Sequence, residues 1–164
     1  GGSGAFAIQL AKRAGAHVTG VDNASKLDFM RQLGADAVID YRQDDFTRTG
    51  PYDRVFDNVA HRSVFAYQRS LARGGRYRCG GGTTRALLRI LTAGTFVGLA
   101  TGRRIGVLAV RMGPDHFTEL ADLCVAGEVD IHIDRTFPLE QTADALAYVG
   151  EGKALGKVVV AVSE

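Results

Sequence analysis

GGSGAFAIQLAKRAGAHVTGVD, residues 1–22, decides the fold of this chain. A glycine-rich loop is followed by a stretch whose polar residues share one side, which predicts an amphipathic helix, and residues 17–21 then predict a β-strand. Backbone N–H groups at the start of such a helix bind phosphate groups. Gly1 and Gly4 have the spacing of the last two glycines of G-x-G-x-x-G, and Asp22 follows about 20 positions later, where an acid accepts hydrogen bonds from ribose hydroxyls.

Segments typical of strands and helices alternate along the rest of the chain. We expect strands at residues 37–40, 54–57, 76–79, 104–110, 130–134 and 156–162, the last of them buried, and helices at residues 26–33, 63–71, 114–126 and 138–149. Residues 83–101 are expected to start as a helix and end as a loop. Such alternation over short loops predicts an α/β fold with a Rossmann-type doubly wound parallel sheet, covered on both faces. The first strand would lie upstream of residue 1, so we expect the sheet to lack it.

Bulk composition limits the function classes. With 164 residues of which 46% are hydrophobic, the chain has material for one core, so residues 1–164 are expected to form one domain. A net charge of +2 spread over both halves argues against nucleic acid and membrane surfaces as partners. Cys79 and Cys124 form no CxxC pair, which argues against a disulfide framework and a zinc site. Without a signal-peptide pattern, we expect a reducing, cytoplasmic setting.

The ordered blocks of the chain resemble a known family. GGSGAFAIQLAKRAGAHVTGVD, KLDFMRQLGADAVIDYRQDDF, YDRVFDNV, LARGGRY, IDRTFPLEQTADAL and GKVVV resemble, in this order, the coenzyme-binding domain of the zinc-independent medium-chain dehydrogenases/reductases, the quinone oxidoreductase group. The resemblance implies NAD(P)H as cofactor and hydride transfer to a quinone, an enone or a related carbonyl acceptor. It also implies an upstream barrel-like domain, so we expect the isolated chain to bind cofactor weakly and to be inactive.

The resemblance also assigns cofactor-binding residues. Gly1, Gly2, Ser3 and Gly4 match the loop over the pyrophosphate, although Ser3 stands where the family usually has Val. Lys26 and Tyr41 fall where NADPH-using members surround the 2′-phosphate, whereas the carboxylate of Asp22 would repel that phosphate. The choice between NAD and NADP therefore stays open.

Two residue pairs that follow predicted strands complete the predicted site. Asn58 and Val59 follow residues 54–57, and Gly80 and Gly81 follow residues 76–79, where the family passes the adenosine and nicotinamide ends of the cofactor. No catalytic residue and no metal ligand can be assigned. The family further implies a homodimer formed through the strand at residues 104–110.

Other interpretations of these residues stay open. GGSG is also typical of a linker, Asp22 of a helix cap, Lys26 of a solvated helix residue and Tyr41 of a lid over the sheet edge. A methyltransferase that binds S-adenosylmethionine shares the glycine-rich loop and the acid, but it would end in an antiparallel hairpin. A non-catalytic module that senses nucleotide or scaffolds a dimer is a further alternative. The four histidines form no cluster, and Arg85, Arg89, Arg103, Arg104 and Arg111 are interpreted as a solvated face.

Overall fold

The chain divides into two compact units in the computed structural model, which describes residues 1–110, 113 and 117–162. The first unit comprises Gly1–Asp40 and Gly113–Glu164, and the second comprises Tyr41–Met112. Every strand pairing described in either unit is parallel. A mixed α/β fold with parallel strands is therefore confirmed, while the single domain over residues 1–164 stays a prediction.

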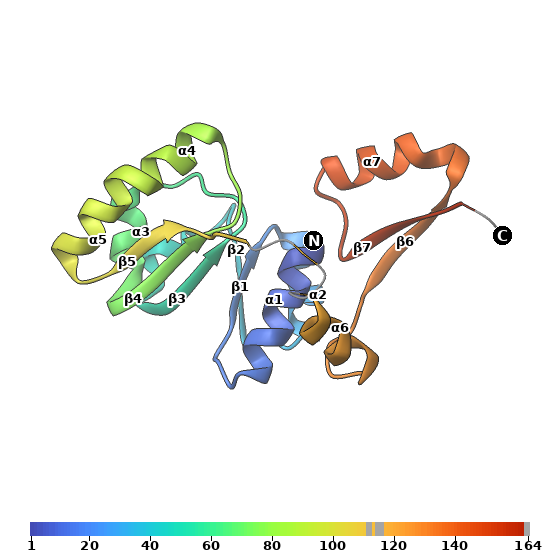
Figure 1. Ribbon diagram of the computed structural model, residues 1–164, viewed down its shortest axis with the longest axis horizontal. Helices are drawn as coiled ribbons and strands as arrows, with labels where there is room; N and C mark the ends of the chain where they lie inside the picture. The colour runs from blue at the N-terminus through green and yellow to red at the C-terminus, as the bar shows by residue number, and fades with distance from the viewer. Residues whose placement is uncertain (111–112, 114–116, 163–164) are drawn as a thin grey trace. The chain divides into compact units, whose positions relative to one another are not determined.

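The first unit begins with a helix, a strand, a helix and a strand, as expected (Figure 1). Its first elements are α1 (Gly2–Arg13), β1 (Thr19–Asp22), η1 (Ala24–Lys26), α2 (Leu27–Gln32) and β2 (Ala37–Asp40). β1 and β2 pair in register from Thr19 opposite Ala37 to Asp22 opposite Asp40. Ile8, Met30 and Ala35 are buried together. Burial of these apolar side chains holds both helices against the strand pair.

The rest of the first unit is a second parallel pair with its own helix. Its elements are α6 (Thr118–Val125), β6 (Ile133–Pro138), η5 (Leu139–Gln141), α7 (Thr142–Gly150) and β7 (Lys157–Ala161). The carboxylate of Asp134 joins these elements, accepting from the Tyr148 hydroxyl at 2.9 Å and from the Leu155 amide at 3.0 Å. β7 alternates between exposed and half-buried residues, so the expectation of a buried strand is wrong. Residues 114–116, where the helix before residue 126 was expected to begin, lie outside the described residues.

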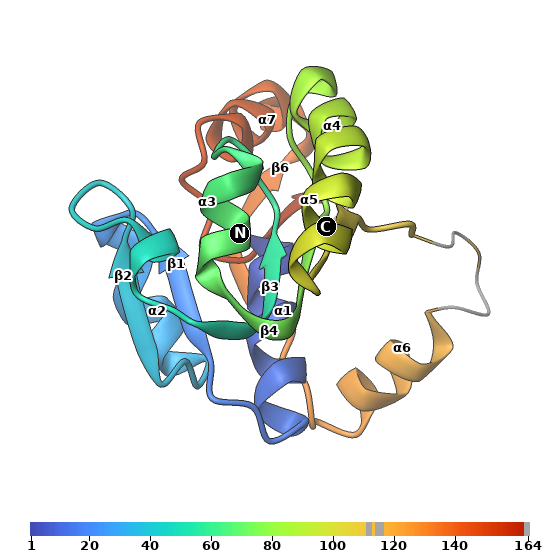
Figure 2. The ribbon, with the colours of Figure 1, turned by 90° about the vertical axis from the view of Figure 1, so that its left-hand side faces the viewer.

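The second unit is a three-stranded parallel sheet with helices on one face. Its elements are η2 (Phe46–Arg48), β3 (Tyr52–Asp57), α3 (Val64–Ser70), β4 (Leu71–Cys79), α4 (Thr84–Arg89), the π-helical turn η3 (Ile90–Gly94), α5 (Thr95–Thr101) and β5 (Arg104–Val107). The sheet order is β3-β4-β5. Tyr67, Tyr77 and Ile90 are fully buried where the helices meet the sheet. Figure 2 shows α3 beside the α4–α5 segment over this sheet.

Residues 83–101 differ from the expectation, because their second half is helical and not a loop. Thr and Gly are poor helix formers, which is why the sequence favours a loop there. The hydroxyl of Thr95 donates to the Leu91 carbonyl at 2.8 Å. A Cβ on Gly98 would lie 2.8 Å from the Arg103 carbonyl oxygen, so the glycine allows the helix to approach β5 closely. Tertiary packing thus overrides a weak local propensity.

Two strands of this sheet also differ in length from the prediction. β4 begins at Leu71, which pairs with Tyr52, and it continues past a register shift to Arg76 opposite Arg54. The expected strand over residues 104–110 ends as a regular strand at Val107. Of the helices in the described residues, none is long and apolar enough to cross a membrane.

Candidate functional site

The N-terminal end of α1 is open in the way that a phosphate site requires. Gly1 is the N-cap and offers no side chain to the first-turn amides, and among the described residues no side-chain cap of α1 is found. A Cβ added to Gly1 or to Gly4 would meet no atom within 4 Å, and Ser3 is exposed. Free N–H groups and the positive end of the helix dipole favour an anion at this place. The four predicted loop residues therefore form the cap and first turn of α1.

Asp22 and Lys26 lie together in the same unit. Oδ2 of Asp22 lies 3.8 Å from Nζ of Lys26, and Oδ1 accepts from the Asn23 amide at 2.8 Å. The Asp22 side chain is 30% exposed, so a ligand can reach it, whereas the Lys26 side chain is 8% exposed. The pKa of the Gly1 amino group is lowered by burial and then by Lys26, which marks Lys26 as a neighbour of the α1 N-terminus.

These contacts decide two of the open interpretations. Asn23, and not Asp22, is the cap of η1, because its side-chain oxygen accepts from the Ser25 amide at 3.0 Å. Lys26 is buried, so it is not a solvated helix residue. An ammonium group is costly to bury without a partner. Its position between Asp22 and the helix start is consistent with an anion site.

Lys157 is a residue of this region that the sequence analysis missed. Its Nζ lies 5.4 Å from the centroid of the Phe6 ring and 3.3 Å from where a Cβ on Gly2 would lie. Gly2 therefore leaves room for a cation that comes from β7. No sequence pattern links the two residues, because they lie near opposite ends of the chain.

In the second unit, the other two predicted pairs lie just beyond the carboxyl ends of the neighbouring strands β3 and β4. The Gly80 amide donates to the Asp57 carbonyl at 2.8 Å, and the Ala60 amide donates to the Gly81 carbonyl at 3.1 Å. A Cβ on Gly81 would lie 2.3 Å from the Asn58 carbonyl oxygen. Asn58 and Val59 are exposed. The two loops therefore lie side by side, as expected, and Gly81 is required by the neighbouring loop itself.

Hydrogen bonds of Asp57 with Tyr77 and with the backbone hold the first of these loops in place. The Tyr77 hydroxyl donates to Oδ2 of Asp57 at 2.7 Å, while Oδ1 accepts from the Val59 amide at 2.9 Å. Tyr67 stacks on Tyr77 with ring centroids 4.0 Å apart. Burial raises the pKa of the Tyr77 hydroxyl above its ordinary value, and Tyr67 and Asp57 raise it further, so this donor stays protonated. The sequence analysis missed this pair, although Asp57 ends its strand as Asp22 does.

Tyr41 belongs to the second unit and is 42% exposed. The guanidinium of Arg42 lies 5.9 Å from the centroid of its ring, so this phenol has a cationic neighbour. A cation beside a hydroxyl donor is the chemistry that a phosphate group needs. The interpretation of Tyr41 as a 2′-phosphate contact stays a prediction.

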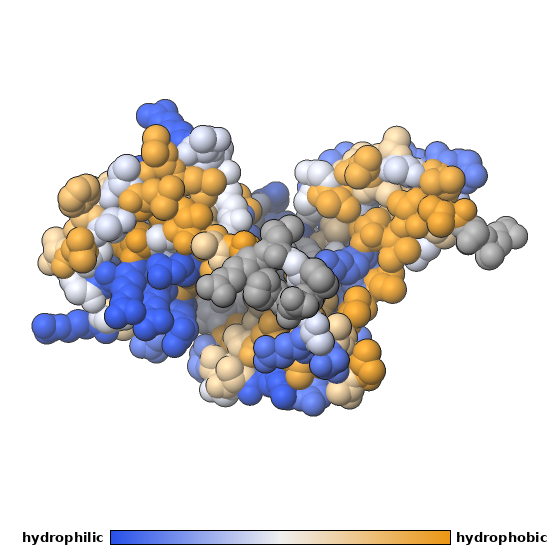
Figure 3. Space-filling view, in the orientation of Figure 1, coloured by the Kyte–Doolittle hydropathy of each residue, from blue (hydrophilic) through white to orange (hydrophobic). Residues whose placement is uncertain are grey.

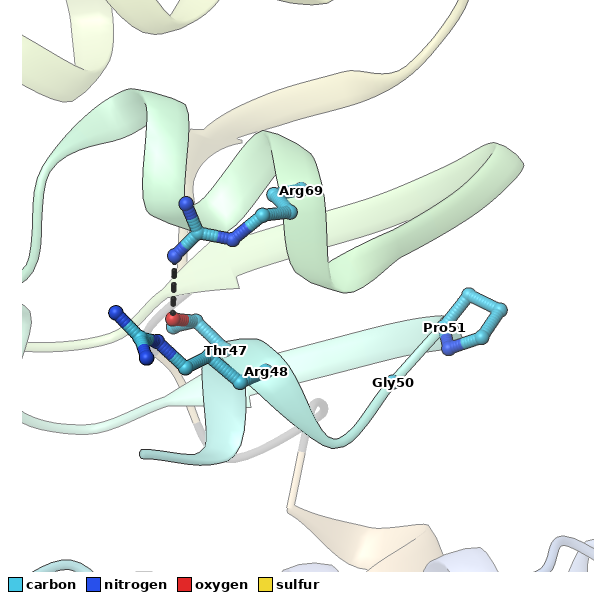
Figure 4. Close-up of a pocket in the computed structure, with 5 residues that line it drawn as sticks. All are labelled: Thr47, Arg48, Gly50, Pro51 and Arg69. Carbon is cyan, nitrogen blue, oxygen red and sulfur yellow. Dashed lines mark hydrogen bonds between the residues drawn. The ribbon is translucent and has the colours of Figure 1, made fainter. Parts of the chain in front are cut away.

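A pocket of about 470 Å³ lies elsewhere in the second unit (Figure 4). It is lined by Thr47, Arg48, Gly50, Pro51 and Arg69, at the start of β3 and the end of α3. Nη2 of Arg69 donates to the Thr47 hydroxyl at 3.3 Å, which anchors η2 to α3. Ligands of parallel sheets bind beyond the carboxyl ends of the strands. This pocket lies at the amino end of β3, so it does not match the predicted cofactor site.

Metal ligation finds no support in residues 1–110, 113 and 117–162, where no three His, Cys, Asp or Glu side chains could hold an ion together. His61 contacts the Val59 carbonyl, and His132 packs on Phe29 with ring centroids 4.7 Å apart. His116 lies outside the described residues. Zinc sites need three or four converging ligands. No such set of converging ligands lies in this part of the chain.

The chain is similar to several known proteins. Residues 33–160 match the zinc-binding dehydrogenase family. The mitochondrial NAD(P)H oxidoreductase RTN4IP1 of Mus musculus is 32% identical over 98% of this chain and 45% of that protein. The chloroplastic quinone oxidoreductase QR1 of Triphysaria versicolor is 30% identical over 98% of this chain and 49% of that protein. The structure of the quinone oxidoreductase from Coxiella burnetii matches with a TM-score of 0.83 and 27% identity, over 99% of this chain and 50% of that one.

The parallel strands and the match to the quinone oxidoreductase structure show a Rossmann-like domain of the medium-chain dehydrogenase/reductase type. The chain belongs to the medium-chain dehydrogenase/reductase family and is quinone oxidoreductase-like. It spans about half the length of the relatives it matches, roughly their coenzyme-binding half.

Proposed function

We propose that this chain is the cofactor-binding part of an NAD(P)H-dependent oxidoreductase that transfers hydride to a quinone, an enone or a related carbonyl. The observation that carries the proposal is the α1 N-terminus, where uncapped amides, uncrowded Gly1 and Gly4, a partly exposed Asp22 and a buried Lys26 belong to one unit. Relatives whose names include NAD(P)H oxidoreductase and quinone oxidoreductase support it.

Each group at this end of α1 has a proposed part in binding. Amides of the first turn bind the pyrophosphate, and the Asp22 carboxylate accepts hydrogen bonds from the ribose hydroxyls. When bound, the nicotinamide supplies the hydride, so the protein binds and orients the reacting groups. We further propose that Asn58, Val59, Gly80 and Gly81 contact the cofactor through their backbone, with Asp57 positioning the Val59 amide.

Cofactor choice depends on the balance between Asp22 and Lys26. A carboxylate repels a 2′-phosphate, whereas the ammonium group 3.8 Å from it attracts one. Asp22→Ser removes the repulsion and leaves Lys26 in place. Fluorescence titration should then show NADPH affinity increasing about tenfold relative to NADH, equal to about 1.4 kcal/mol.

Asp28→Ser provides a charge-matched control, because Asp28 is 89% exposed and pairs with Arg31 on α2. This variant should leave both affinities unchanged. An unchanged ratio in Asp22→Ser would place Asp22 away from the ribose. Absence of any melting-temperature shift with millimolar NADH and NADPH would favour the non-catalytic module instead.

Activity of the whole protein is part of the same proposal. The 164 residues alone are expected to bind cofactor weakly and to turn over nothing, because substrate positioning needs a further domain. Detectable NADPH-dependent quinone reduction by this chain alone would contradict that expectation. The methyltransferase alternative is disfavoured by β6 and β7, which pair in parallel where a methyltransferase would end in an antiparallel hairpin.

A homodimer is proposed through residues 104–110. β5 is one of the two edge strands of its sheet, and Leu108 and Val110 after it are 38% and 62% exposed. An exposed apolar edge is a template for pairing with a second copy. Light scattering should therefore give a dimer, and Leu108→Lys should shift the protein towards monomer. A monomer at high concentration would contradict the proposal.

The names of the relatives place those proteins in mitochondria and chloroplasts, so the cytoplasmic setting stays a prediction.

A further inference from the structure

Three arginines form a row across the β3–β4–β5 sheet. The parallel register places Arg54 opposite Arg76 and Arg76 opposite Arg104. Residues at one level of neighbouring strands point to the same face and lie about 4.8 Å apart. Val55, Tyr77 and Ile105, one position further along, face the helices. The three arginines therefore share the opposite face, where all three are exposed.

A fourth arginine extends this row along the sheet. Arg78 lies two positions after Arg76 and so points to the same face. Its Nη1 lies 3.0 Å from where a Cβ on Gly106 would lie, so its guanidinium extends over the backbone of β5. Any side chain at position 106 would displace it. Figure 3 shows the hydrophilic side chains gathered in one patch over this sheet.

A pocket of about 250 Å³ lies at the end of the same row. Its lining is Asp53, Arg54, Arg73, Gly74, Gly75 and Arg76, so three guanidinium groups and one carboxylate border it. We call Arg54, Arg76, Arg78 and Arg104 the arginine face, and Arg73 lies beside it at the pocket. Arg104 begins β5 and Arg78 lies one residue before the carboxyl end of β4, whereas the loops at residues 58–60 and 80–82 follow the carboxyl ends of β3 and β4.

Asp53 is the one acidic residue that lines the pocket, and in the described part of the chain it forms no ion pair with these arginines. None of the ion pairs found in residues 1–110, 113 and 117–162 involves the arginine face or Arg73. Like charges directly opposite each other on neighbouring strands are destabilising. An external anion would remove that repulsion, and guanidinium groups bind phosphate oxygens in bidentate fashion.

We propose that the arginine face binds a small multivalent phosphate, a chain of two or more linked phosphoryl groups, at a site that the dinucleotide does not use. A single ion engages one guanidinium pair, whereas linked phosphoryl groups engage arginines of adjacent strands at once. Binding should therefore strengthen with the number of linked groups. This inference is independent of the proposed cofactor site, because it uses none of its residues.

Calorimetric titration of the intact chain at constant ionic strength tests the proposal, with inorganic phosphate, pyrophosphate and tripolyphosphate as probes. Affinity should increase in that order, and Arg76→Gln should weaken tripolyphosphate binding at least tenfold. Arg85→Gln is the matched control, because Arg85 is exposed on α4, whose Ala86 packs on the other face of the sheet. It should leave the affinity unchanged.

Thermal unfolding gives a second readout that shows the variant is folded. At low salt Arg76→Gln should melt higher than the wild type, because it removes repulsion, and tripolyphosphate should raise its melting temperature less. The proposal is overturned if both variants lose the same affinity, or if sulfate at matched ionic strength binds as well as tripolyphosphate. It is equally overturned if saturating NADH or NADPH displaces tripolyphosphate, or if double-stranded DNA binds tightly and displaces it.

Discussion

Glycines in the two units differ in whether the space beside them is open or filled. At the start of α1, Gly1 and Gly4 have no atom within 4 Å of an added Cβ, so the space beside them is open to a ligand. After β3 and β4, the space beside Gly81 is already filled by the Asn58 carbonyl, 2.3 Å from an added Cβ. The first region leaves room, whereas the second needs its glycine to pack its own loops. Residue type alone does not distinguish a binding glycine from a packing glycine.

Gly81→Ala should have the largest effect on this contrast. Its methyl group would collide with backbone, which cannot rotate away as a side chain can, so we expect a loss of about 3 kcal/mol in the free energy of unfolding. Gly80→Ala is the control, because its Cβ would meet the Phe56 ring at 3.2 Å, and that side chain is 44% exposed and able to move. Urea unfolding measures both variants. Equal losses would show that the loops are not packed by Gly81.

Tyr77→Phe tests the hydrogen bond to Asp57 that helps to hold the same loops. It removes the donor to Asp57 and leaves a half-buried carboxylate oxygen without it, which should cost about 1–3 kcal/mol. Urea unfolding gives this loss, and hydrogen exchange should show faster exchange of the Val59 amide, which the same carboxylate holds. Tyr52→Phe is the matched variant, because its hydroxyl contacts that of Thr49 at an exposed site. If Tyr52→Phe costs as much, the Asp57 network is not special.

Gly4→Ala should act in the opposite direction at the open region. Ala is the better helix former and finds no obstacle there, so the free chain should gain about 0.5–1 kcal/mol in the free energy of unfolding. If the pyrophosphate approaches this turn, the same methyl group should weaken NADH and NADPH binding. Chemical unfolding and cofactor titration measure the two effects. A stabilised variant with unchanged cofactor affinity would remove Gly4 from the site.

Asp36→Asn should give the smallest effect, and it depends on pH. Hydrogen bonds from Lys12 and from the Val18 amide, opposed by desolvation, hold the pKa of Asp36 below its ordinary value of 3.8. Because the pKa is lower in the folded state, the ionised carboxylate stabilises the fold at pH values above 3.8. This stabilisation is lost as the pH falls through the folded-state pKa. The variant should therefore melt below the wild type at pH 7, with a gap that narrows below about pH 4. A gap that does not change with pH would contradict this assignment.

The sequence predicted the features that depend on neighbouring residues, and it missed those that depend on contacts between residues distant in sequence. The β2 strand at residues 37–40 and the places of Gly1 and Asp22 follow from spacing and periodicity within a few residues of each other. The helix at residues 95–101 could not be predicted, because Gly98 within it and Gly94 before it are explained by packing against β5 and not by neighbours in sequence. Burial of Lys26, the Tyr77–Asp57 hydrogen bond and the arginine row each depend on tertiary contacts or strand register.

Lys157 links the two ends of the sequence at the proposed phosphate site. The Lys157 side chain from β7 lies beside Gly2, the first residue of α1, so part of the positive potential at that helix start comes from a residue distant in sequence. Trimming the protein behind residue 156 to obtain a minimal cofactor-binding fragment would remove this cation. A cofactor-binding fragment should therefore keep β7, because Lys157 begins this strand.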